Sequence, residues 1–400
     1  MFLIYNFSIR TYGLIIRIAA LFNDKAGKWS TGRKNFFENL PELPKNPICW
    51  VHCASLGEFD MALPVLRKLK EKNPNYYLVV TFFSPSGMEH YQKRKNPVDL
   101  ALYLPLDTRR NAKRFMAYLK PELGIIVKYE FWNNHILEAK KNGAKLYSIG
   151  TLLRKNQHYF KFYGQFFRKT LALFDCFFTQ NQNTIDLLNS IGIEKCVLTG
   201  DPRIDQVLQN KNHFVPNPKI ETFLNGKKAI IIGSSWEEDE TMLFPFILGN
   251  KNDTFIIAPH DISEKNIKRI EKNLEGLTQR YTDEQKNESP VLILNTIGHL
   301  NTAYHYGKYA YVGGGFSGKL HNILEPAVFG LPVIFGPKYD RFPEAQTFLE
   351  MGIGFSAQTT ETLKDIEKKI SNNLNELQIK TSSYIENQCG TDEKIISFII

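Results

Sequence analysis

Short apolar runs alternate with stretches of helical periodicity along most of the chain, from about residue 47 onward. Apolar strands separated by helices are typical of a parallel sheet that is covered by helices on both faces. A helix is expected over Phe59–Lys72, directly after the first apolar run. The first series of predicted strands comprises residues 48–53, 76–83, 100–107, 123–130, 145–150, 175–180 and 196–200.

A polar segment that contains two prolines, residues 206–226, interrupts this pattern and is interpreted as a linker. A second series of apolar runs follows it, and the last part, 371–400, is expected to be helical. We therefore predict an α/β chain with two Rossmann-like domains, 41–205 and 227–370, that face a cleft. Ligands of such sheets bind beyond the carboxyl ends of the strands. The predicted strands of the second series are 229–235, 254–260, 290–296, 309–315 and 331–337.

The N-terminal segment, residues 1–40, begins with a strongly apolar stretch over 2–22 that carries Arg10 and Arg17. At ~100° per residue, both arginines fall on nearly one line of a helix, which leaves a broad apolar surface beside them. A helix that lies in the membrane interface, with the basic stripe toward the lipid headgroups, fits this pattern best. A single membrane-spanning helix and a helix buried in the protein core are the alternatives.

The formal net charge of +9 favours an anionic partner, such as a phosphorylated small molecule or an anionic membrane surface. Because no basic block is interleaved with aromatic residues, we do not expect the chain to bind nucleic acid. The five cysteines form no CxxC pair and show no zinc-like spacing with histidine. Free thiols in a reducing compartment are therefore expected.

A glycine-rich tract near residue 313, with the sequence GGGFSGKLHNILEP, carries the most suggestive chemistry. It resembles a P-loop, but Leu320 occupies the position where a P-loop needs Ser or Thr to hold magnesium. The Asn322 side chain and the free N–H groups of the helix that follows could hold a phosphate. Glu325 could accept hydrogen bonds from a ribose diol. Alternatively, the glycines only turn the chain and Glu325 stabilises the helix dipole.

Three charged residues follow predicted strands of the first domain. Glu58 stands at the start of a helix, where the helix dipole should favour the carboxylate and make it a proton acceptor, although it could equally serve only the helix. Glu130 is expected at the cleft edge of its strand. Arg203 could neutralise a phosphate or a sugar carboxylate, or form an ion pair with Asp201 or Asp205.

Several common site types find no support in the sequence. No D-x-D pair follows a strand and no H-x-x-x-H occurs, so no metal site is predicted. No G-x-S-x-G supports an acyl hydrolase, and the glycine clusters lack the spacing of a dinucleotide-binding motif. We therefore expect neither a metal nor another cofactor.

Five segments together resemble the bacterial 3-deoxy-D-manno-octulosonic acid (Kdo) transferases: HCASLGE, KYEFWNN, TGDPRID, GSSWEEDE and the tract from HNILEP to FGLPVIFGP. The resemblance implies a GT-B fold, CMP-Kdo as donor and a lipid A precursor, lipid IVA, as acceptor in lipopolysaccharide biosynthesis. It also implies an inverting, metal-independent transfer at the cytoplasmic face of the bacterial inner membrane.

Matched position by position, the resemblance implies that Glu58 is the catalytic base and that Glu130 and Arg203 stabilise the transition state. The family usually has Lys where Arg203 stands, Arg where His260 stands and His where Trp236 stands. The residues assigned to CMP-Kdo binding are Ser234, Ser235, Pro259, His260, Ile297, Gly298, His299, Gly314, Asn322, Ile323, Leu324 and Glu325.

Two alternatives to a Kdo transferase remain at this point. The first is another GT-B enzyme, either a different glycosyltransferase or a UDP-sugar epimerase of the same architecture. The second is a membrane-tethered binding module that lacks catalytic activity. Turnover with CMP-Kdo distinguishes the first alternative, and the effect of replacing Glu58 distinguishes the second.

Overall fold

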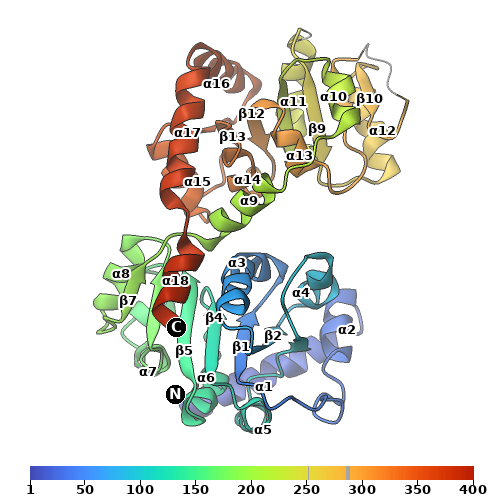
Figure 1. The fold of residues 1–400 in the computed structure, drawn as a ribbon. Helices are drawn as coiled ribbons and strands as arrows, with labels where there is room; N and C mark the ends of the chain where they lie inside the picture. The colour runs from blue at the N-terminus through green and yellow to red at the C-terminus, as the bar shows by residue number, and fades with distance from the viewer. Residues whose placement is uncertain (251, 285–288) are drawn as a thin grey trace. The chain divides into compact units, whose positions relative to one another are not determined.

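The computed structural model describes residues 1–250, 252–284 and 289–400, which form two compact units (Figure 1). Unit 1 comprises Met1–Gln206 and Cys389–Ile400, and unit 2 comprises Val207–Gln388. The segment expected as a linker, 206–226, is largely helical. It holds most of α9 (Pro202–Asn212) and all of α10 (Pro218–Leu224).

Unit 1 is built on a seven-stranded sheet in the order β3-β2-β1-β4-β5-β6-β7, and every neighbouring pair is parallel. The predicted strand series is confirmed, although several strands are shorter than predicted: the one expected over 123–130 ends at Val127. The strands are β1 (Ile48–Cys53), β2 (Tyr77–Phe82), β3 (Leu100–Tyr103), β4 (Leu123–Val127), β5 (Lys145–Thr151), β6 (Cys176–Thr179) and β7 (Cys196–Leu198).

Both faces of this sheet are buried, which explains why its strands are apolar without alternation. In β1, Cys49, Val51 and Cys53 belong to the core on one face, and Ile48 and Trp50 belong to the core on the other. All five cysteines of the chain are free thiols, as predicted. The main covering helices are α3 (Leu56–Lys72), α5 (Arg109–Leu119), α6 (Asn133–Lys141), α7 (Gln165–Leu171), α8 (Gln182–Asn189) and α18 (Thr391–Ile399).

Unit 2 repeats this plan with a second parallel sheet in the order β10-β11-β9-β8-β12-β13-β14. The two edge strands were not predicted, because each is only three residues long and lacks an apolar run. The strands are β8 (Ala229–Ser235), β9 (Phe255–Pro259), β10 (Thr278–Arg280), β11 (Val291–Ile293), β12 (Gly307–Val312), β13 (Val333–Phe335) and β14 (Gly354–Ser356).

Helices surround the sheet of unit 2, and the last of them returns the chain to unit 1. The predicted C-terminal segment 371–400 is helical, but its final residues, Cys389–Ile400, belong to unit 1. Besides α10, the helices of this unit are α11 (Glu237–Gly249), α12 (Glu264–Asn273), α13 (Leu300–Tyr304), α14 (Leu324–Ala327), α15 (Pro343–Glu350), α16 (Thr360–Asn372) and α17 (Leu374–Gln388).

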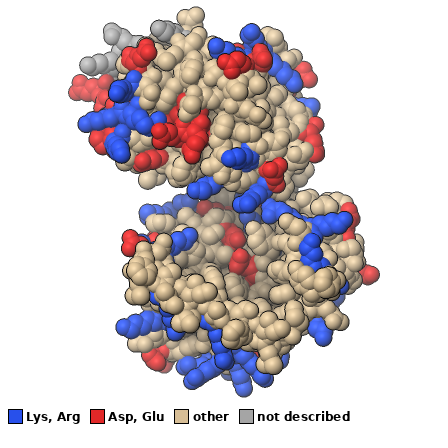
Figure 2. All heavy atoms as spheres, turned by 180° about the vertical axis from the view of Figure 1, so that it is seen from behind, with Lys and Arg blue, Asp and Glu red and all other residues tan. Residues whose placement is uncertain are grey.

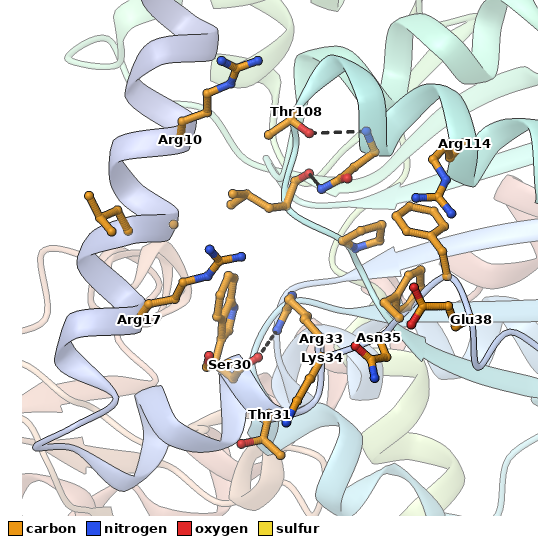
Figure 3. A pocket seen from close by; sticks show the side chains of 18 residues that line it. Arg10, Arg17, Ser30, Thr31, Arg33, Lys34, Asn35, Glu38, Thr108 and Arg114 are labelled. Carbon is orange, nitrogen blue, oxygen red and sulfur yellow. Dashed lines mark hydrogen bonds between the residues drawn. The ribbon is translucent and has the colours of Figure 1, made fainter.

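The N-terminal segment folds into α1 (Phe2–Ala19) and α2 (Asp24–Thr31), which lie against unit 1 and border a cavity there (Figure 3). Of the residues of α1, Ile9 and Gly13 are buried. Within the described residues, no helix is both long and apolar enough to cross a membrane. Figure 2 shows Lys and Arg side chains gathered along the lower edge of unit 1 in that view.

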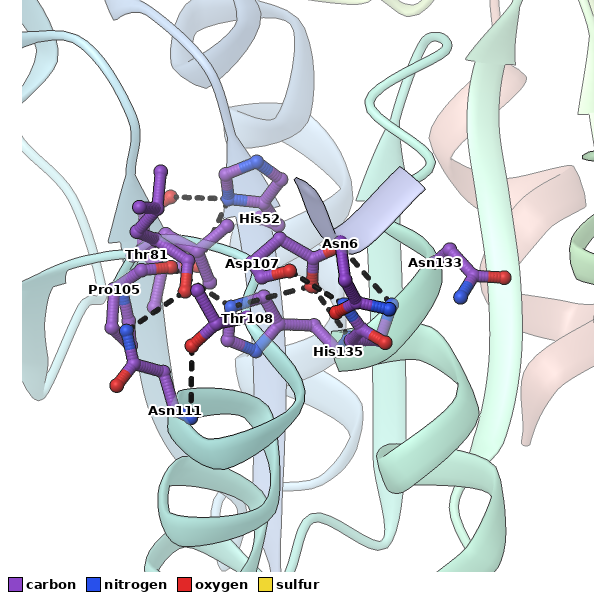
Figure 4. Close-up of polar contacts among 12 residues, drawn as sticks. Asn6, His52, Thr81, Pro105, Asp107, Thr108, Asn111, Asn133 and His135 are labelled. Carbon is purple, nitrogen blue, oxygen red and sulfur yellow. Dashed lines mark hydrogen bonds and ion pairs between the residues drawn. The ribbon is translucent and has the colours of Figure 1, made fainter. Parts of the chain in front are cut away.

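A buried polar network fastens α1 to the rest of unit 1 (Figure 4). The Tyr5 hydroxyl donates to the fully buried carboxylate of Asp107 at 2.5 Å, and the Asn134 side chain donates to Asn6 at 3.1 Å. Asp107 also accepts from the backbone N–H groups of Asn134 and His135. Because a buried carboxylate depends on such partners, these bonds hold the inner face of α1 against the protein.

A glycine contact at the centre of unit 2 gives a stability prediction. A Cβ added to Gly313, just after β12, would lie 2.2 Å from the Ser234 carbonyl oxygen, so one backbone segment would have to move. Gly313→Ala should therefore destabilise unit 2 by about 1–3 kcal/mol, as overpacking does elsewhere. Urea unfolding followed by tryptophan fluorescence and circular dichroism measures this change.

Gly249→Ala is the matched control, because a Cβ there meets nothing within 4 Å and the residue ends α11. It should be neutral or stabilise by ~0.5–1 kcal/mol through helix propensity. Equal effects of the two substitutions would contradict the steric argument.

Candidate active site

The centre of each sheet is a topological switch point, where neighbouring strands are followed by connections that lead to opposite faces. In unit 1 these strands are β1 and β4, which pair directly. In unit 2 they are β8 and β12. Open α/β sheets bind ligands at such points, beyond the carboxyl ends of the strands. The predicted residues Glu58 and Glu130 follow the first pair, and Ser234 and Gly314 lie at the ends of the second.

Glu58 is the third residue of α3 and closes the turn that leaves β1. Ser55 is the N-cap residue, and the Glu58 carboxylate reaches back to accept from the backbone N–H groups of Ala54 and Ser55. This is the glutamate half of a capping box. The residue is only 8% exposed and forms no ion pair among the residues described. Glu58 is therefore held in one orientation by the loop that it closes.

Burial sets the proton affinity of Glu58. Burial and, to a smaller extent, the neighbouring charge of Glu130 together raise the pKa of the Glu58 carboxyl to about 7. The Ala54 N–H group and the Lys128 ammonium oppose the rise without cancelling it. The helix dipole, which was expected to favour the carboxylate, is outweighed here by desolvation. A carboxyl group with this pKa can accept and return a proton near neutrality.

The β4 turn brings a second carboxyl group and an ammonium group to the same place. Glu130 lies three residues beyond the end of β4 and is half-buried, and this burial raises its pKa. Lys128 has a φ of 60°, in the left-handed region that few non-glycine residues adopt. Backbone strain of this kind gathers at functional sites. Sequence reasoning did not single out Lys128. Its position two residues before Glu130 was the signal that could have marked it as a site residue.

Arg203 forms the ion pair that was considered as its alternative role. It is the second residue of α9, and its guanidinium donates to both carboxylate oxygens of Asp201, at 2.5–3.1 Å. Asp205, the other possible partner, instead accepts from the N–H groups of Gly390 and Asp392 at the start of α18. Arg203 is thus anchored at the end of unit 1, with its charge shared with one carboxylate.

In unit 2, Asp239 joins the two loops of the switch point. Its buried carboxylate accepts from the Trp236 N–H group at 2.9 Å, the Tyr311 hydroxyl at 2.8 Å and the Gly314 N–H group at 2.8 Å. Gly314 has a φ of 90°, which favours glycine at this turn. Sequence reasoning missed Asp239, because an acidic residue in a first helical turn is usually a solvent-exposed dipole partner.

An aromatic cluster with one ammonium group covers the same edge of the sheet. The Trp236 and His260 rings stack with centroids 4.0 Å apart, and the Trp236 indole N–H donates to His321 Nε2 at 3.2 Å. Burial lowers the pKa of His321 to about 4, which keeps this acceptor nitrogen unprotonated. The exposed Lys319 ammonium lies 5.3 Å from the centre of the Trp236 ring. His321 and Lys319 were not predicted as site residues.

In the predicted tract 322–325, the two polar residues at its ends, Asn322 and Glu325, are partly exposed. Asn322 accepts from the Leu324 N–H group at 3.1 Å and donates to the Glu325 carboxylate at 3.3 Å. Ile323 and Leu324 are buried in the core, so only their backbones are available to a ligand. The Ser235 hydroxyl is also buried and donates to the Glu240 carboxylate at 2.8 Å, which is a structural contact.

The remaining predicted residues follow two other strands of this sheet. Pro259 ends β9, and the N–H group of the exposed His260 donates to the Ser235 carbonyl at 2.9 Å. Between β11 and α13, the Ile297 side chain is 86% exposed, and His299 packs against Tyr281 with ring centroids 4.3 Å apart. Since β11, β9, β8 and β12 are neighbours, all these segments line one carboxyl edge of the sheet.

Comparison with known protein families identifies relatives over most of the chain. The family model described as 3-deoxy-D-manno-octulosonic-acid transferase (kdotransferase) matches residues 30–206. The chain is 28% identical over 331 residues to a 3-deoxy-D-manno-octulosonic acid transferase of Aquifex aeolicus, covering 80% of this chain and 86% of that protein. A protein of the same name from Chlamydia pneumoniae is 29% identical, with coverages of 83% and 79%.

Solved structures share the fold at low sequence identity. UDP-GlcNAc 2-epimerase from Neisseria meningitidis superposes with a TM-score of 0.66 at 16% identity, covering 88% of this chain and 99% of that one. MurG from Acinetobacter baumannii superposes with a TM-score of 0.58 at 14% identity and the same coverages. Together with the two parallel sheets, these likenesses confirm the predicted fold class, a GT-B chain of two Rossmann-like domains with an N-terminal helix.

The three bonds to Asp239 predict a local change in the loop that contains Gly314. Asp239→Ala removes both acceptor oxygens, so the N–H groups of Trp236 and Gly314 lose the partner that they share. Leaving a buried donor unpaired costs about 1–3 kcal/mol. Hydrogen–deuterium exchange read by mass spectrometry should become faster in peptides containing Trp236 and Gly314. Glu238→Ala, at the exposed neighbouring position, should leave exchange unchanged; equal acceleration in both variants would contradict the role of Asp239.

Proposed function

Because the chain belongs to the 3-deoxy-D-manno-octulosonic acid (Kdo) transferase family and is therefore a glycosyltransferase, we propose that it transfers Kdo from CMP-Kdo to lipid IVA, a lipid A precursor, in lipopolysaccharide biosynthesis. The observation that carries this proposal is the similarity to enzymes of that name over 80% of the chain. The two carboxyl groups at the switch point of unit 1 supply the chemistry that such a transfer needs.

Glu58 acts as the general base in this proposal. It takes the proton from an acceptor hydroxyl while the oxygen of that hydroxyl bonds to the anomeric carbon of Kdo. The bond from that carbon to the CMP phosphate breaks in the same displacement, and the phosphate leaves with the electron pair, so the anomeric configuration inverts. A pKa of about 7 suits this task, because about half of the group is ionised at neutral pH and the ionised form is basic enough to take the proton.

Unit 2 holds the nucleotide. The loop N–H groups beside Gly314 and Asn322, together with the Lys319 ammonium, would stabilise the charge that develops on the departing phosphate. Asn322 and Glu325 would meet the polar groups of CMP, and the exposed rings near His260 offer a stacking surface. No metal ion is required in this scheme, since the charge is met by fixed donors.

Glu130 and Arg203 have supporting roles in the proposed reaction. The Glu130 charge keeps the proton affinity of Glu58 high. The Arg203 guanidinium, which holds Asp201, could share its charge with the carboxylate of Kdo as the transition state forms. Both residues would lower the barrier through electrostatics, without bonding to the reacting atoms.

Transfer itself is tested by incubating the full-length chain with CMP-Kdo and lipid IVA and analysing the products by mass spectrometry. We expect a mass increase of one or more Kdo units, and the same product in the presence of EDTA. UDP-GlcNAc is offered in parallel, since the fold is shared with UDP-GlcNAc 2-epimerases. Turnover of UDP-GlcNAc without turnover of CMP-Kdo would overturn the proposal.

The base is tested by Glu58→Gln, which keeps an oxygen to accept from the Ala54 N–H group but cannot take a proton. Transfer should fall by about 10²–10⁴-fold, the usual contribution of a general base. In the unmodified enzyme, the raised pKa means that ionisation is completed only as pH rises through about 7, so activity should increase across that range. The variant should lose this pH dependence.

Glu71→Gln on the exposed part of α3 is the matched control and should retain both activity and pH profile. Glu58→Asp keeps the carboxyl group but shortens its reach, and it should retain partial activity with a pH-dependent limb. Undiminished transfer by Glu58→Gln would remove Glu58 from the mechanism and leave its capping role.

We further propose that α1 lies in the plane of the cytoplasmic face of the inner membrane. One side of the helix is fastened to unit 1 through Tyr5 and Asn6. Its other side exposes large apolar residues, a pattern that suits an interfacial helix. This position on the membrane would bring the enzyme to an acceptor that is itself a lipid. The exposed apolar residues of α1 and the following turn are Leu3, Ile4, Phe7, Leu14, Ile15, Ile18, Leu21 and Phe22.

A further inference from the structure

We propose that the cavity between α1, α2 and α5 of unit 1 binds the phosphate of an anionic membrane lipid. The inference deepens the proposed membrane seat of α1 and rests on it. The cavity has a volume of about 730 Å³ and opens beside α1 (Figure 3). It is distinct from the strand ends that carry Glu58 and Glu130, and none of its lining residues serves the proposed transfer.

The charge of the cavity is strongly one-sided. Its lining includes Arg10, Arg17, Lys34 and Arg114, against the single carboxylate of Glu38. In the ranges that the structure describes, none of these four basic side chains forms an ion pair. Arg10 and Arg17 project from α1 toward the cavity, and Arg114 approaches from α5 (Figure 3). Unpaired positive charge around a concave surface raises the local concentration of anions.

A fifth basic residue, Arg33, supports the wall of the cavity. Its guanidinium donates to the carbonyl groups of Trp29, Phe83 and Leu104 and packs against the rings of Trp29, Phe83 and Tyr103. Arg33 is therefore committed to holding α2 against the sheet. Because each nitrogen of the Arg33 guanidinium already donates within the protein, a ligand in the cavity would be contacted by the arginines of α1.

A close contact at Gly13 sets the position of both arginines of α1. A Cβ at this residue would lie 2.5 Å from a methyl carbon of Leu106, so the helix approaches the turn before α5 closely here. Arg10 and Arg17 lie on either side of this point. At 1.5 Å of rise per residue they are separated by ~10 Å along the helix axis, so both reach the same cavity from its rim.

The surroundings of the cavity favour an amphiphilic occupant. Leu14 lines the cavity and is 58% exposed. It is one of the exposed apolar residues of α1 named above. Phe162, in the loop before α7, is 96% exposed. Phe166 of α7 packs against Phe2 of α1. A ligand with a phosphate in the cavity and hydrocarbon beside α1 would satisfy both surfaces. Free inorganic phosphate would satisfy only the first.

The test compares two variants that lose equal charge. Arg10→Gln/Arg17→Gln removes the charges that line the cavity. Arg109→Gln/Arg110→Gln removes two exposed charges at the start of α5 that do not line it. Flotation of the full-length chain is measured with vesicles of phosphatidylcholine alone and of phosphatidylcholine with phosphatidic acid. Unchanged thermal unfolding by circular dichroism establishes that each variant is folded.

We expect the cavity variant to lose about tenfold or more of its affinity for vesicles containing phosphatidic acid, and the α5 variant to lose much less. Both should bind neutral vesicles like the unmodified chain, through the apolar stripe. Arg10→Lys/Arg17→Lys should also weaken binding, because lysine keeps the charge but not the two-pronged donor geometry. Equal losses in the cavity and α5 variants would mean diffuse attraction and would overturn the cavity site alone.

Two further outcomes separate this inference from its premise. If the unmodified chain binds neither kind of vesicle, the membrane seat of α1 is wrong and the lipid site falls with it. The source of the phosphate is decided by calorimetry with soluble dihexanoyl phosphatidic acid and with inorganic phosphate. The lipid should bind more tightly, and equal binding of inorganic phosphate would overturn the assignment to a lipid.

Discussion

The divergence of the chain at the centre of each parallel sheet is the constraint on which the candidate site residues of each unit depend. Two neighbouring strands, β1 and β4 in unit 1 and β8 and β12 in unit 2, are followed by connections that leave toward opposite faces. No crossover can cover the gap between them, so their ends remain available to a ligand. The carboxyl groups of Glu58 and Glu130 and the glycine loop beside Asp239 all stand at these two positions.

Desolvation then sets the pKa values of the ionisable groups at these strand ends. At the β1 turn, two backbone N–H groups and a helix N-terminus favour the charged form of Glu58, yet burial and the charge of Glu130 prevail. The same burial keeps His321 unprotonated in unit 2, where its ring accepts from Trp236. A shallower turn would leave Glu58 an ordinary acid, ionised and weakly basic at neutral pH. The burial of the strand ends thus determines whether Glu58 can act as a base.

The fold could be predicted because its strands are continuous apolar runs. The site could be predicted only where a side chain follows such a run within a short turn. Glu58, Glu130 and the glycine tract met that condition. Asp239 did not, since its burial follows from the crossing of two loops 75 residues apart in sequence. His321 and Lys319 gain meaning only from the ring stack around Trp236. The three-residue edge strands β10 and β14 carry too few apolar positions to be recognised.

The N-terminal helix shows why periodicity alone could not choose among its alternatives. A spanning helix, a buried helix and an interfacial helix can share the same apolar content, and they differ in what meets the polar groups. Here Asp107 is fully buried and depends on Tyr5 for one of its hydrogen bonds. Lifting α1 into a bilayer would leave that buried acceptor without this partner, at a cost of about 1–3 kcal/mol. The same movement would carry Arg10 and Arg17 into hydrocarbon, which is costlier still. A helix that is fastened on one side and apolar on the other is therefore consistent with the proposed position at a membrane surface, and not with a spanning helix.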